Sequence, residues 1–369
     1  MKKIRSNYRF LFAGGGTGGH LFPLVAVAER IRKLLPEAEI LFIGTKSKIE
    51  GTIVPKLGFK FRSIWIKGFS RKLNLENLLF PLKLGVSLIQ SLLINMRFKP
   101  KVAIGSGGYV SGPAIWGSSV VGAKVILLEQ NSYPGITTRL LERYAAEVHL
   151  SFEDSIKYFK NEIKLKVTGN PIREYLVKIN KEKALNQFGL DPSYKTIFVL
   201  GGSLGASSIN KAIEKFITYD ASKTVNIIWQ TGKNYYGLYS PLVSKNIVVK
   251  DFIDNMNLAY SACDLLISRA GATTIAEIIA LGIPSILVPS PNVAENHQFY
   301  NAKSLADKNA AVLLKDNNLL DTLAEKISEL LGNNEKLVEI SRNARSLYKV
   351  NAAEIIANNA IKYCKDGKS

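Results

Sequence analysis

The chain has 369 residues, of which 47% are hydrophobic and 21% are charged, and its mean hydropathy is +0.06. This length exceeds what one ordinary core organises, and the composition excludes a disordered chain and a polytopic membrane protein. Two cysteines, Cys263 and Cys364, form no disulfide framework or metal-ligand set, which favours a reducing cytoplasm. The net charge of +19 favours nucleic acid, an anionic membrane or a phosphorylated substrate as partner, although a lysine-rich proteome gives the same excess.

Apolar runs typical of buried strands alternate with helical patterns along the chain. The basic start, MKKIRSNYRFLFAGGG, has no cleavage signal and is interpreted as a first strand, not a signal peptide. The strand-like runs are 8–13, 40–44, 102–106, 125–129 and 148–152, then 196–200, 226–230, 247–250, 265–268 and 285–289. The alternation predicts an α/β protein with parallel sheets covered by helices on both faces.

The strand pattern restarts near residue 195, after turn residues at 168–171 that place a hinge close to Pro171. We therefore predict two Rossmann-like domains facing a cleft. The first covers 1–170, the second covers 171–349, and a helix at about 350–369 packs back on the first.

A glycine-rich loop, AGGGTGGH (13–20), follows the first apolar run. It satisfies the G-x-G-x-x-G fingerprint of dinucleotide-binding proteins, in which the second strand ends in an acid. Here that strand ends FIGTK (42–46), which argues against a dinucleotide. A second loop, GGSLGA (201–206), follows the run 196–200. Because ligands of such folds lie beyond the carboxyl ends of the strands, we expect both loops to line the cleft.

Glycines at a strand-to-helix turn let the backbone approach an anion, toward which the next helix points free N–H groups. His20 follows the first loop, near Pro23 in the expected first helical turn, where a neutral imidazole suits a general base. A helix-capping role is the alternative. His149 lies in a strand-like run and is expected to be structural. Glu277, inside the helix after 265–268, can accept both hydroxyls of a ribose; an ordinary solvated carboxylate is the alternative.

Seven stretches over nearly the whole chain together resemble the MurG family of peripheral glycosyltransferases, which add N-acetylglucosamine to lipid I to give lipid II in peptidoglycan synthesis. They are GGGTGGHLFP (14–23), GSGGYVSGP (105–113), EQNSYPG (129–135), TGNPIR (168–173), LGGSLGASSIN (200–210), SRAGATTIAE (268–277) and NHQFYNA (296–302). The resemblance implies the GT-B architecture, with lipid I at the N-terminal domain and UDP-N-acetylglucosamine mainly at the C-terminal domain. It also implies a peripheral location at the cytoplasmic face of the plasma membrane.

Carried over position by position, the resemblance implies a set of donor-binding residues. They are Thr17, Gly18, Gly19, Asn131, Arg173, Ser203, Ile253, Ala272, Thr273, Thr274, Glu277 and Gln298. The stretch ATTIAE departs from the family pattern, which leaves the contacts of Thr273 and Thr274 open. Ser203 and Arg173 suit a diphosphate, and Ile253 can flank the uracil.

The amides of Asn131 and Gln298 suit sugar hydroxyls, and a bond to their own loops is the alternative for each. The chain has no D-x-D pair, so we expect no obligate metal and no cofactor.

Residues 67–101 carry seven Lys or Arg and one acid, Glu76. On a helix, one face collects the apolar residues Leu84, Leu88, Ile89, Leu92, Leu93 and Met96, and the other the polar residues Lys83, Ser87, Gln90, Ser91 and Asn95. Pro81 and Gly85 argue against a spanning helix. Packing on the first sheet explains the apolar face, whereas the cations suit docking on anionic lipid through the exposed Leu78, Leu79, Phe80 and Lys83.

We therefore predict an inverting transferase in which the muramyl 4-hydroxyl of lipid I attacks the anomeric carbon and UDP departs. His20 is the first candidate for the base, and helix N-termini, Ser203 and Arg173 stabilise the diphosphate charge. The expected partners are UDP-N-acetylglucosamine, lipid I and an anionic membrane surface, with cell-wall synthesis proteins as further candidates. Nucleic acid is not expected, because no binding module occurs. A UDP-N-acetylglucosamine 2-epimerase and a non-catalytic membrane-recruited scaffold remain as rivals.

Overall fold

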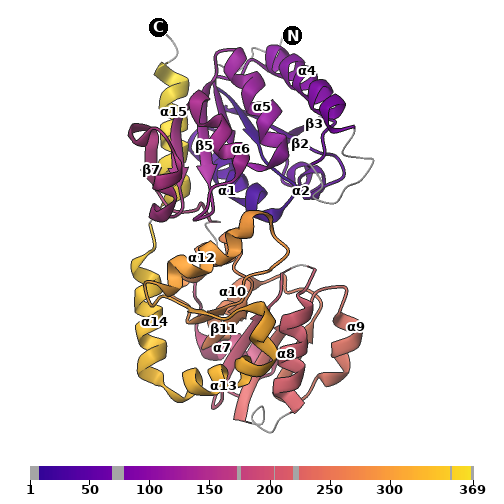
Figure 1. The fold of residues 1–369 in the computed structure, drawn as a ribbon, viewed down its shortest axis with the longest axis vertical. Coiled ribbons are helices and arrows are strands. Elements are labelled where there is room, and N and C mark those ends of the chain that lie inside the picture. The colour runs from indigo at the N-terminus through magenta and orange to yellow at the C-terminus, as the bar shows by residue number, and fades with distance from the viewer. Residues whose placement is uncertain are drawn as a thin grey trace. The chain divides into compact units, whose positions relative to one another are not determined.

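The computed structural model describes residues 8–68, 79–172, 176–202, 204–218, 224–349 and 351–366. The chain divides into two compact units (Figure 1). The N-terminal unit is Met1–Arg173 together with Lys349–Ser369, and the C-terminal unit is Glu174–Tyr348. Each unit is a parallel sheet covered by helices on both faces, the class of fold predicted from the near-continuous apolar strand runs.

The N-terminal sheet has seven parallel strands in the order β3-β2-β1-β4-β5-β6-β7. The strands are β1 (Arg9–Ala13), β2 (Glu39–Gly44), β3 (Lys60–Ser63), β4 (Val102–Gly105), β5 (Lys124–Glu129), β6 (Ala145–Leu150) and β7 (Leu165–Val167). The helices are α1 (Gly18–Leu34), α2 (Ile49–Lys56), α4 (Phe80–Phe98), α5 (Gly108–Val120), α6 (Ile136–Leu141) and α15 (Ala352–Asp366). The strand order reverses between β1 and β4, so the loops after these strands flank the crevice where such sheets bind ligands.

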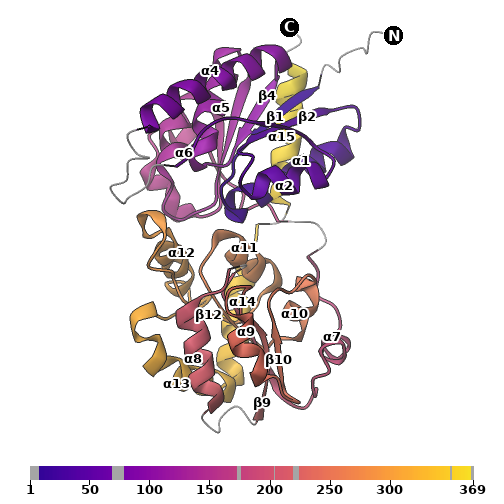
Figure 2. The same ribbon diagram turned by 90° about the vertical axis from the view of Figure 1, so that its right-hand side faces the viewer.

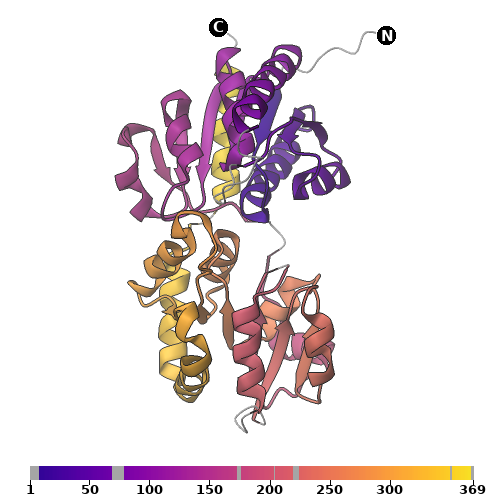
Figure 3. The same ribbon diagram turned by 45° about the vertical axis from the view of Figure 1, so that its right-hand side comes forward.

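The C-terminal helix α15 belongs to the N-terminal unit, as Figure 2 and Figure 3 show by its yellow colour among indigo and magenta elements. Its buried residues Ile356, Ala357 and Ala360 join the core beneath α1. On β6, Glu147 accepts hydrogen bonds from Asn359 at 2.9 Å and Tyr363 at 3.0 Å. Two distant segments of the chain are thus fastened by one carboxylate.

Glu147 also organises the predicted structural histidine. His149 is buried on β6, and its Nε2 lies 3.0 Å from Glu147 Oε2. Burial acts to raise the pKa of Glu147, but hydrogen bonds from His149, Lys166 and Tyr363 outweigh it and lower the pKa to about 2.

The C-terminal sheet has six parallel strands in the order β10-β9-β8-β11-β12-β13. The strands are β8 (Lys195–Leu200), β9 (Val225–Gln230), β10 (Ile247–Lys250), β11 (Leu265–Ser268), β12 (Ser285–Leu287) and β13 (Val312–Leu313). The helices are α7 (Lys181–Phe188), α8 (Ser207–Thr218), α9 (Tyr236–Tyr239), α10 (Met256–Ala262), α11 (Ala272–Leu281), α12 (His297–Ala306), α13 (Leu319–Gly332) and α14 (Asn334–Ser346). Here the order reverses between β8 and β11.

Three strands, β3, β7 and β13, were not predicted from the sequence. They have four, three and two residues and lie at sheet edges, where a strand needs no continuous apolar run. The predicted first turn of α1 was also misplaced: the helix begins at Gly18, so Pro23 lies in its second turn.

Helix α4 packs in the opposite sense to the prediction, with its polar residues inward. Ser87, Ser91 and Asn95 are fully buried on the side of α5, where Ser118 Oγ donates to Asn95 Oδ1 at 2.7 Å. A Cβ at Gly117 would lie 3.0 Å from Asn95 Nδ2, so the two helices approach closely and need small side chains at the contact. We call the outward apolar residues the α4 stripe: Leu79, Leu82, Ile89, Leu93 and Met96, each 46% to 63% exposed.

Within the described ranges, no helix has both the length and the apolar content that crossing a bilayer requires.

Candidate functional site

The first glycine loop lies at the β1/β4 reversal and is held by a buried carboxylate. Glu50, from the start of α2, accepts the N–H of Gly16 at 3.0 Å and the N–H and hydroxyl of Thr45 at 3.0 and 2.7 Å. A Cβ at Gly15 would lie 2.4 Å from the Glu50 carboxyl carbon, so this glycine is required. The sequence analysis sought an acid at the end of β2; it missed Glu50, which lies six residues beyond that strand and binds loop backbone.

Besides α2, whose first turn holds Glu50, three helices begin at this edge of the sheet: α1, α5 and α6. In these three helices, whose residues are all described, no acid stands in the first turn and no side chain caps the N-terminus. Their first N–H groups can therefore bind an anion. Thr17 is the exposed N-cap residue of α1, and Gly18 and Gly19 open its first turn.

His20 lies in the first turn of α1, and its ring is fixed by the neighbouring loops. Its Nδ1 lies 2.7 Å from the carbonyl oxygen of Ser106 and 3.3 Å from Gln130 Oε1. The Ser106 hydroxyl donates to the His20 carbonyl at 2.7 Å. Because a carbonyl oxygen only accepts, Nδ1 carries the proton in the neutral ring, and the basic lone pair is on Nε2. This is the tautomer that a general base requires.

A second titratable group, Glu129, ends β5 at the same edge. Burial raises its pKa to about 7, although hydrogen bonds from Asn131, Thr138 and Gly135 oppose that shift. The N–H and side-chain amide of Asn131 donate to Glu129 Oε1 at 3.0 and 3.2 Å. Asn131 thus makes the contact within its own loop that the alternative interpretation predicts.

The C-terminal unit has a cavity of about 690 Å³ at the β8/β11 reversal, within the size range of small-molecule sites. The loop after β8 forms one wall, and its Gly205 has φ +81° and no room for a Cβ, which would lie 2.0 Å from the Thr231 carbonyl oxygen. Helix α11 starts at the opposite wall behind Gly271; its described first turn has no acid and no side-chain cap. A helix N-terminus thus faces the cavity, as a diphosphate site requires.

Glu277 lies half-buried on α11, and its Oε2 accepts a hydrogen bond of 2.6 Å from the hydroxyl of Tyr260. Burial of Tyr260 and the adjacent Glu277 charge raise the pKa of that phenol well above its usual value, so it stays a donor. Gln298 lines the cavity, and its Oε1 accepts the N–H of Ser290 at 2.8 Å, which orients the amide with Nε2 as donor.

The other predicted donor residues differ in their access to the cavity. Thr274 lines it, and Ala272 is buried. Thr273 Oγ1 is buried and has no hydrogen-bond partner among the described residues. The Ile253 side chain is only 6% exposed, which leaves it little surface for a uracil. Arg173, Ser203 and the predicted membrane-contact residue Leu78 lie outside the described residues.

The sequence analysis missed two cationic residues of this cavity, Arg269 and Lys211. Arg269 forms an ion pair with Asp316, donates to Ser208 at 2.8 Å and to the Val288 carbonyl at 3.2 Å, and so fastens the loop after β11. Lys211 is exposed on α8 at the cavity. Its signal in the sequence is a cation one turn after the second glycine loop.

Within the described ranges, no group of three or more His, Cys, Asp or Glu residues is placed to hold a metal ion.

Comparison with known proteins matches both units to one family. The N-terminal domain of glycosyltransferase family 28 matches residues 10–150, and its C-terminal domain matches residues 196–359. The UDP-N-acetylglucosamine–N-acetylmuramyl-(pentapeptide) pyrophosphoryl-undecaprenol N-acetylglucosamine transferase of Flavobacterium psychrophilum is 41% identical over 365 residues, 98% of this chain and 99% of that one. The chain belongs to the MurG family of glycosyltransferases.

Further comparisons agree with this membership. The transferase of the same name from Thermoanaerobacter sp. is 41% identical over 94% of this chain and 98% of its own length. The crystal structure of MurG from Acinetobacter baumannii is 26% identical, with a TM-score of 0.77 over 96% of this chain and 99% of that one. The calicheamicin glycosyltransferase CalG4, 10% identical with a TM-score of 0.71, shares the fold alone. The two Rossmann-like units are those of the GT-B class.

Proposed function

We propose that the protein transfers N-acetylglucosamine from UDP-N-acetylglucosamine to the muramyl 4-hydroxyl of lipid I, with inversion, to give lipid II. The relatives' printed name supports this donor and acceptor. The observation that carries the chemistry is the His20 ring, whose Nδ1 is fixed on the Ser106 carbonyl beside three uncapped helix N-termini.

In the proposed reaction, the acceptor hydroxyl oxygen attacks the anomeric carbon from the face opposite the diphosphate. Its proton passes to Nε2 of His20 as the new glycosidic bond forms. The bond between the anomeric carbon and the β-phosphate oxygen breaks, and UDP leaves with both bonding electrons. This single displacement gives inversion, and the resulting imidazolium later returns its proton to water.

The leaving diphosphate gains charge, which the N-termini of α8 and α11 stabilise. Glu277, oriented by Tyr260, binds the ribose hydroxyls, and Gln298 Nε2 donates to the sugar. The proposal keeps Arg173 and Ser203 on the diphosphate and Ile253 beside the uracil. It keeps the remaining family-derived contacts to the donor as well: Thr17, Gly18, Gly19, Asn131, Ala272, Thr273 and Thr274.

We also propose that the enzyme acts at the cytoplasmic membrane surface through its N-terminal unit. The basis is the α4 stripe, which is an apolar surface about as long as α4 itself. Leu79 at its start is 46% exposed, Phe80 is half-buried, and the ammonium of Lys83 lies 5.8 Å from the centre of the Trp65 ring. Cations beside exposed apolar side chains suit an anionic lipid interface.

Transfer of labelled N-acetylglucosamine to a lipid I analogue, with UDP release monitored, tests the activity. Equimolar labelled product and UDP are expected. If incubation with UDP-N-acetylglucosamine alone changed the sugar's configuration, the epimerase would replace the transferase. Absence of thermal stabilisation by UDP would favour the scaffold, because a ligand that binds the native state raises its stability.

Vesicle flotation tests the location. Leu82→Ser with Ile89→Ser should release the protein from anionic vesicles, whereas Leu238→Ser with Val338→Ser, equally exposed in the C-terminal unit, should not. Equal flotation of both double variants would place the membrane contact elsewhere.

A further inference from the structure

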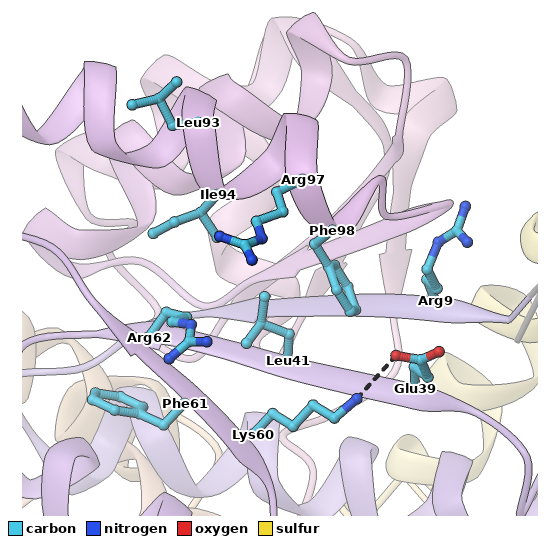
Figure 4. A pocket seen from close by; sticks show the side chains of 10 residues that line it. All are labelled: Arg9, Glu39, Leu41, Lys60, Phe61, Arg62, Leu93, Ile94, Arg97 and Phe98. Carbon is cyan, nitrogen blue, oxygen red and sulfur yellow. Dashed lines mark hydrogen bonds and ion pairs between the residues drawn. The ribbon is translucent and has the colours of Figure 1, made fainter. Parts of the chain in front are cut away.

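The N-terminal unit has a second cavity, of about 620 Å³, away from the glycine loops. It is lined by Arg9, Glu39 and Lys60, which are the first residues of β1, β2 and β3, and by the last turns of α4. The glycine loops follow the opposite, carboxyl ends of the strands. We call this cavity the basic pocket. Figure 4 shows that Arg97 points into it from α4 and that Arg62 points into it from β3.

Charge is the first property that identifies a ligand for the basic pocket. Its lining includes four cations, Arg9, Lys60, Arg62 and Arg97, and one carboxylate, Glu39. Lys60 is paired with Glu39 at 2.9 Å, and Arg9 Nε donates to a carbonyl at 2.7 Å. Arg62 and Arg97 make no ion pair or hydrogen bond with residues that the structure describes. Two exposed guanidinium groups on one cavity suit a phosphate, which they bind with paired N–H donors.

Two of the four cations belong to β3, an edge strand of the sheet. In the sheet register, Lys60 pairs with Leu41 and Arg62 with Ile43, so both cations lie on the face that α4 and α5 cover. Interior strands of a doubly wound sheet carry apolar residues on such a face, whereas β3, at the edge, is mostly exposed and can carry charge there. Arg97, in the last turn of α4, also suits the helix dipole, but Arg62 has no such role. The sheet edge under the end of α4 is therefore open and carries cations beside apolar residues.

The apolar part of the lining identifies the ligand as an amphiphile. Leu93, Ile94 and Phe98 of α4 line the same cavity as the two free-standing guanidinium groups. Leu93 is 60% exposed and is also a member of the α4 stripe, so the basic pocket opens directly onto that apolar surface. A soluble anion would use the cations alone, whereas a lipid uses both parts.

We propose that the basic pocket binds the headgroup of an anionic phospholipid, whose acyl chains lie along the α4 stripe. The inference rests on the proposed membrane location and adds a defined lipid site to it. The residues of α4 that line the pocket, from Leu93 to Phe98, lie about 20 to 27 Å along the helix from its start at Phe80. Lipid contact at both ends of α4 fixes how the glycine-loop edge is held relative to the membrane, where the lipid-linked acceptor resides.

Calorimetric titration with a short-chain phospholipid kept monomeric tests the site without any vesicle. We expect dihexanoyl-phosphatidylglycerol to bind and dihexanoyl-phosphatidylcholine not to bind. Arg62→Gln with Arg97→Gln should weaken binding roughly tenfold or more, because both guanidinium contacts to the phosphate are lost. Lys308→Gln with Arg342→Gln, which removes the same charge from exposed positions of the C-terminal unit, should leave it unchanged.

Four results would overturn the proposal: equal affinity of the pocket variant, equal binding of phosphatidylcholine, inorganic phosphate binding as tightly as the lipid, or an oligoglutamate peptide binding more tightly. The last two would assign the pocket to a soluble anion or to an acidic protein partner. The proposed membrane location is tested separately with vesicles of about three parts phosphatidylcholine to one part phosphatidylglycerol. If the wild-type protein did not float with these vesicles, the membrane location itself would be wrong.

Transfer to a lipid-linked acceptor provides a functional readout. The pocket variant should lose transfer to lipid I in such vesicles and keep transfer to a soluble acceptor analogue, because its catalytic edge is intact. Equal loss with both acceptors would mean that the substitutions damage the unit itself, and a lowered melting temperature would accompany it.

Discussion

In each unit, the edge of the sheet at the carboxyl ends of the strands has a glycine loop and helix N-termini. The two edges carry different side chains. In the N-terminal unit the edge holds His20, whose Nδ1 is fixed on the Ser106 carbonyl, and the buried Glu129, whose pKa burial raises to about 7. In the C-terminal unit it holds groups of fixed charge and fixed donors, with Arg269 locked to Asp316 and Gln298 locked to Ser290. The difference matches the proposed function, which assigns proton transfer to the N-terminal edge and the anionic nucleotide to the C-terminal edge.

The largest effect that tests this contrast is expected at His20. His20→Ala should lower kcat by about 10²–10⁴-fold with little change in donor Kd, because a general base acts only on the reaction step. Single-turnover rates and UDP titration on the same variant measure both quantities. A loss of about 1 kcal/mol in stability with kcat preserved would instead support helix capping.

Glu277→Ala should have the converse effect. Loss of the hydrogen bonds between a charged group and the ribose should weaken donor binding by about one to two decades and leave the fold intact. Glu325→Ala, an exposed carboxylate on α13, is the matched control. An unchanged Kd for UDP-N-acetylglucosamine would remove Glu277 from the donor site.

The pH dependence of stability sharpens the contrast within the N-terminal unit. The raised pKa of Glu129 means that the folded state binds its proton more tightly than the unfolded state. Its stabilising contribution is present below pH 4.5 and is lost as the pH rises through about 7. Glu147, with a pKa of about 2, acts in the opposite sense, and only as the pH falls from 4.5 toward 2.

Glu129→Gln should therefore flatten the fall in melting temperature between pH 4.5 and 7, by several degrees over that window. Thermal scans across this range measure it. An unchanged slope would show that Glu129 is not the group that titrates.

The smallest effect is expected at Lys211. An exposed cation at the cavity rim should contribute less to the binding free energy of UDP than a buried one. Lys211→Gln should therefore weaken UDP binding about threefold at low salt and less at high salt. Salt-dependent titration checks this. A loss as large as that of Glu277→Ala would mean that the lysine contacts the diphosphate directly.

The sequence predicted the parallel sheets because buried parallel strands need unbroken apolar runs, and it located both glycine loops because close backbone approach requires glycine. It could not predict the packing of α4. Periodicity distinguishes apolar from polar faces, but the close contact with Gly117 selects small side chains whatever their polarity. The periodicity therefore separated the two faces of α4 but predicted the wrong one to pack on the unit.

Glu50 and Arg269 were missed for a related reason. Both act by binding backbone of loops that are near in space but distant along the chain, and such contacts leave no local pattern. The basic pocket was missed because its cations come from two strands and one helix that are far apart along the chain. The sequence shows the net charge of +19 but not where on the surface the cations gather.

Hydrogen exchange in the presence of UDP alone, and separately of a soluble lipid I analogue, tests the division between the two edges most directly. We predict that UDP slows exchange in the loops after β8 and β11 and at the start of α11, while the loops after β1 and β4 keep their rates. The acceptor analogue should produce the reverse pattern. Protection by UDP confined to the loops after β1 and β4 would contradict the account.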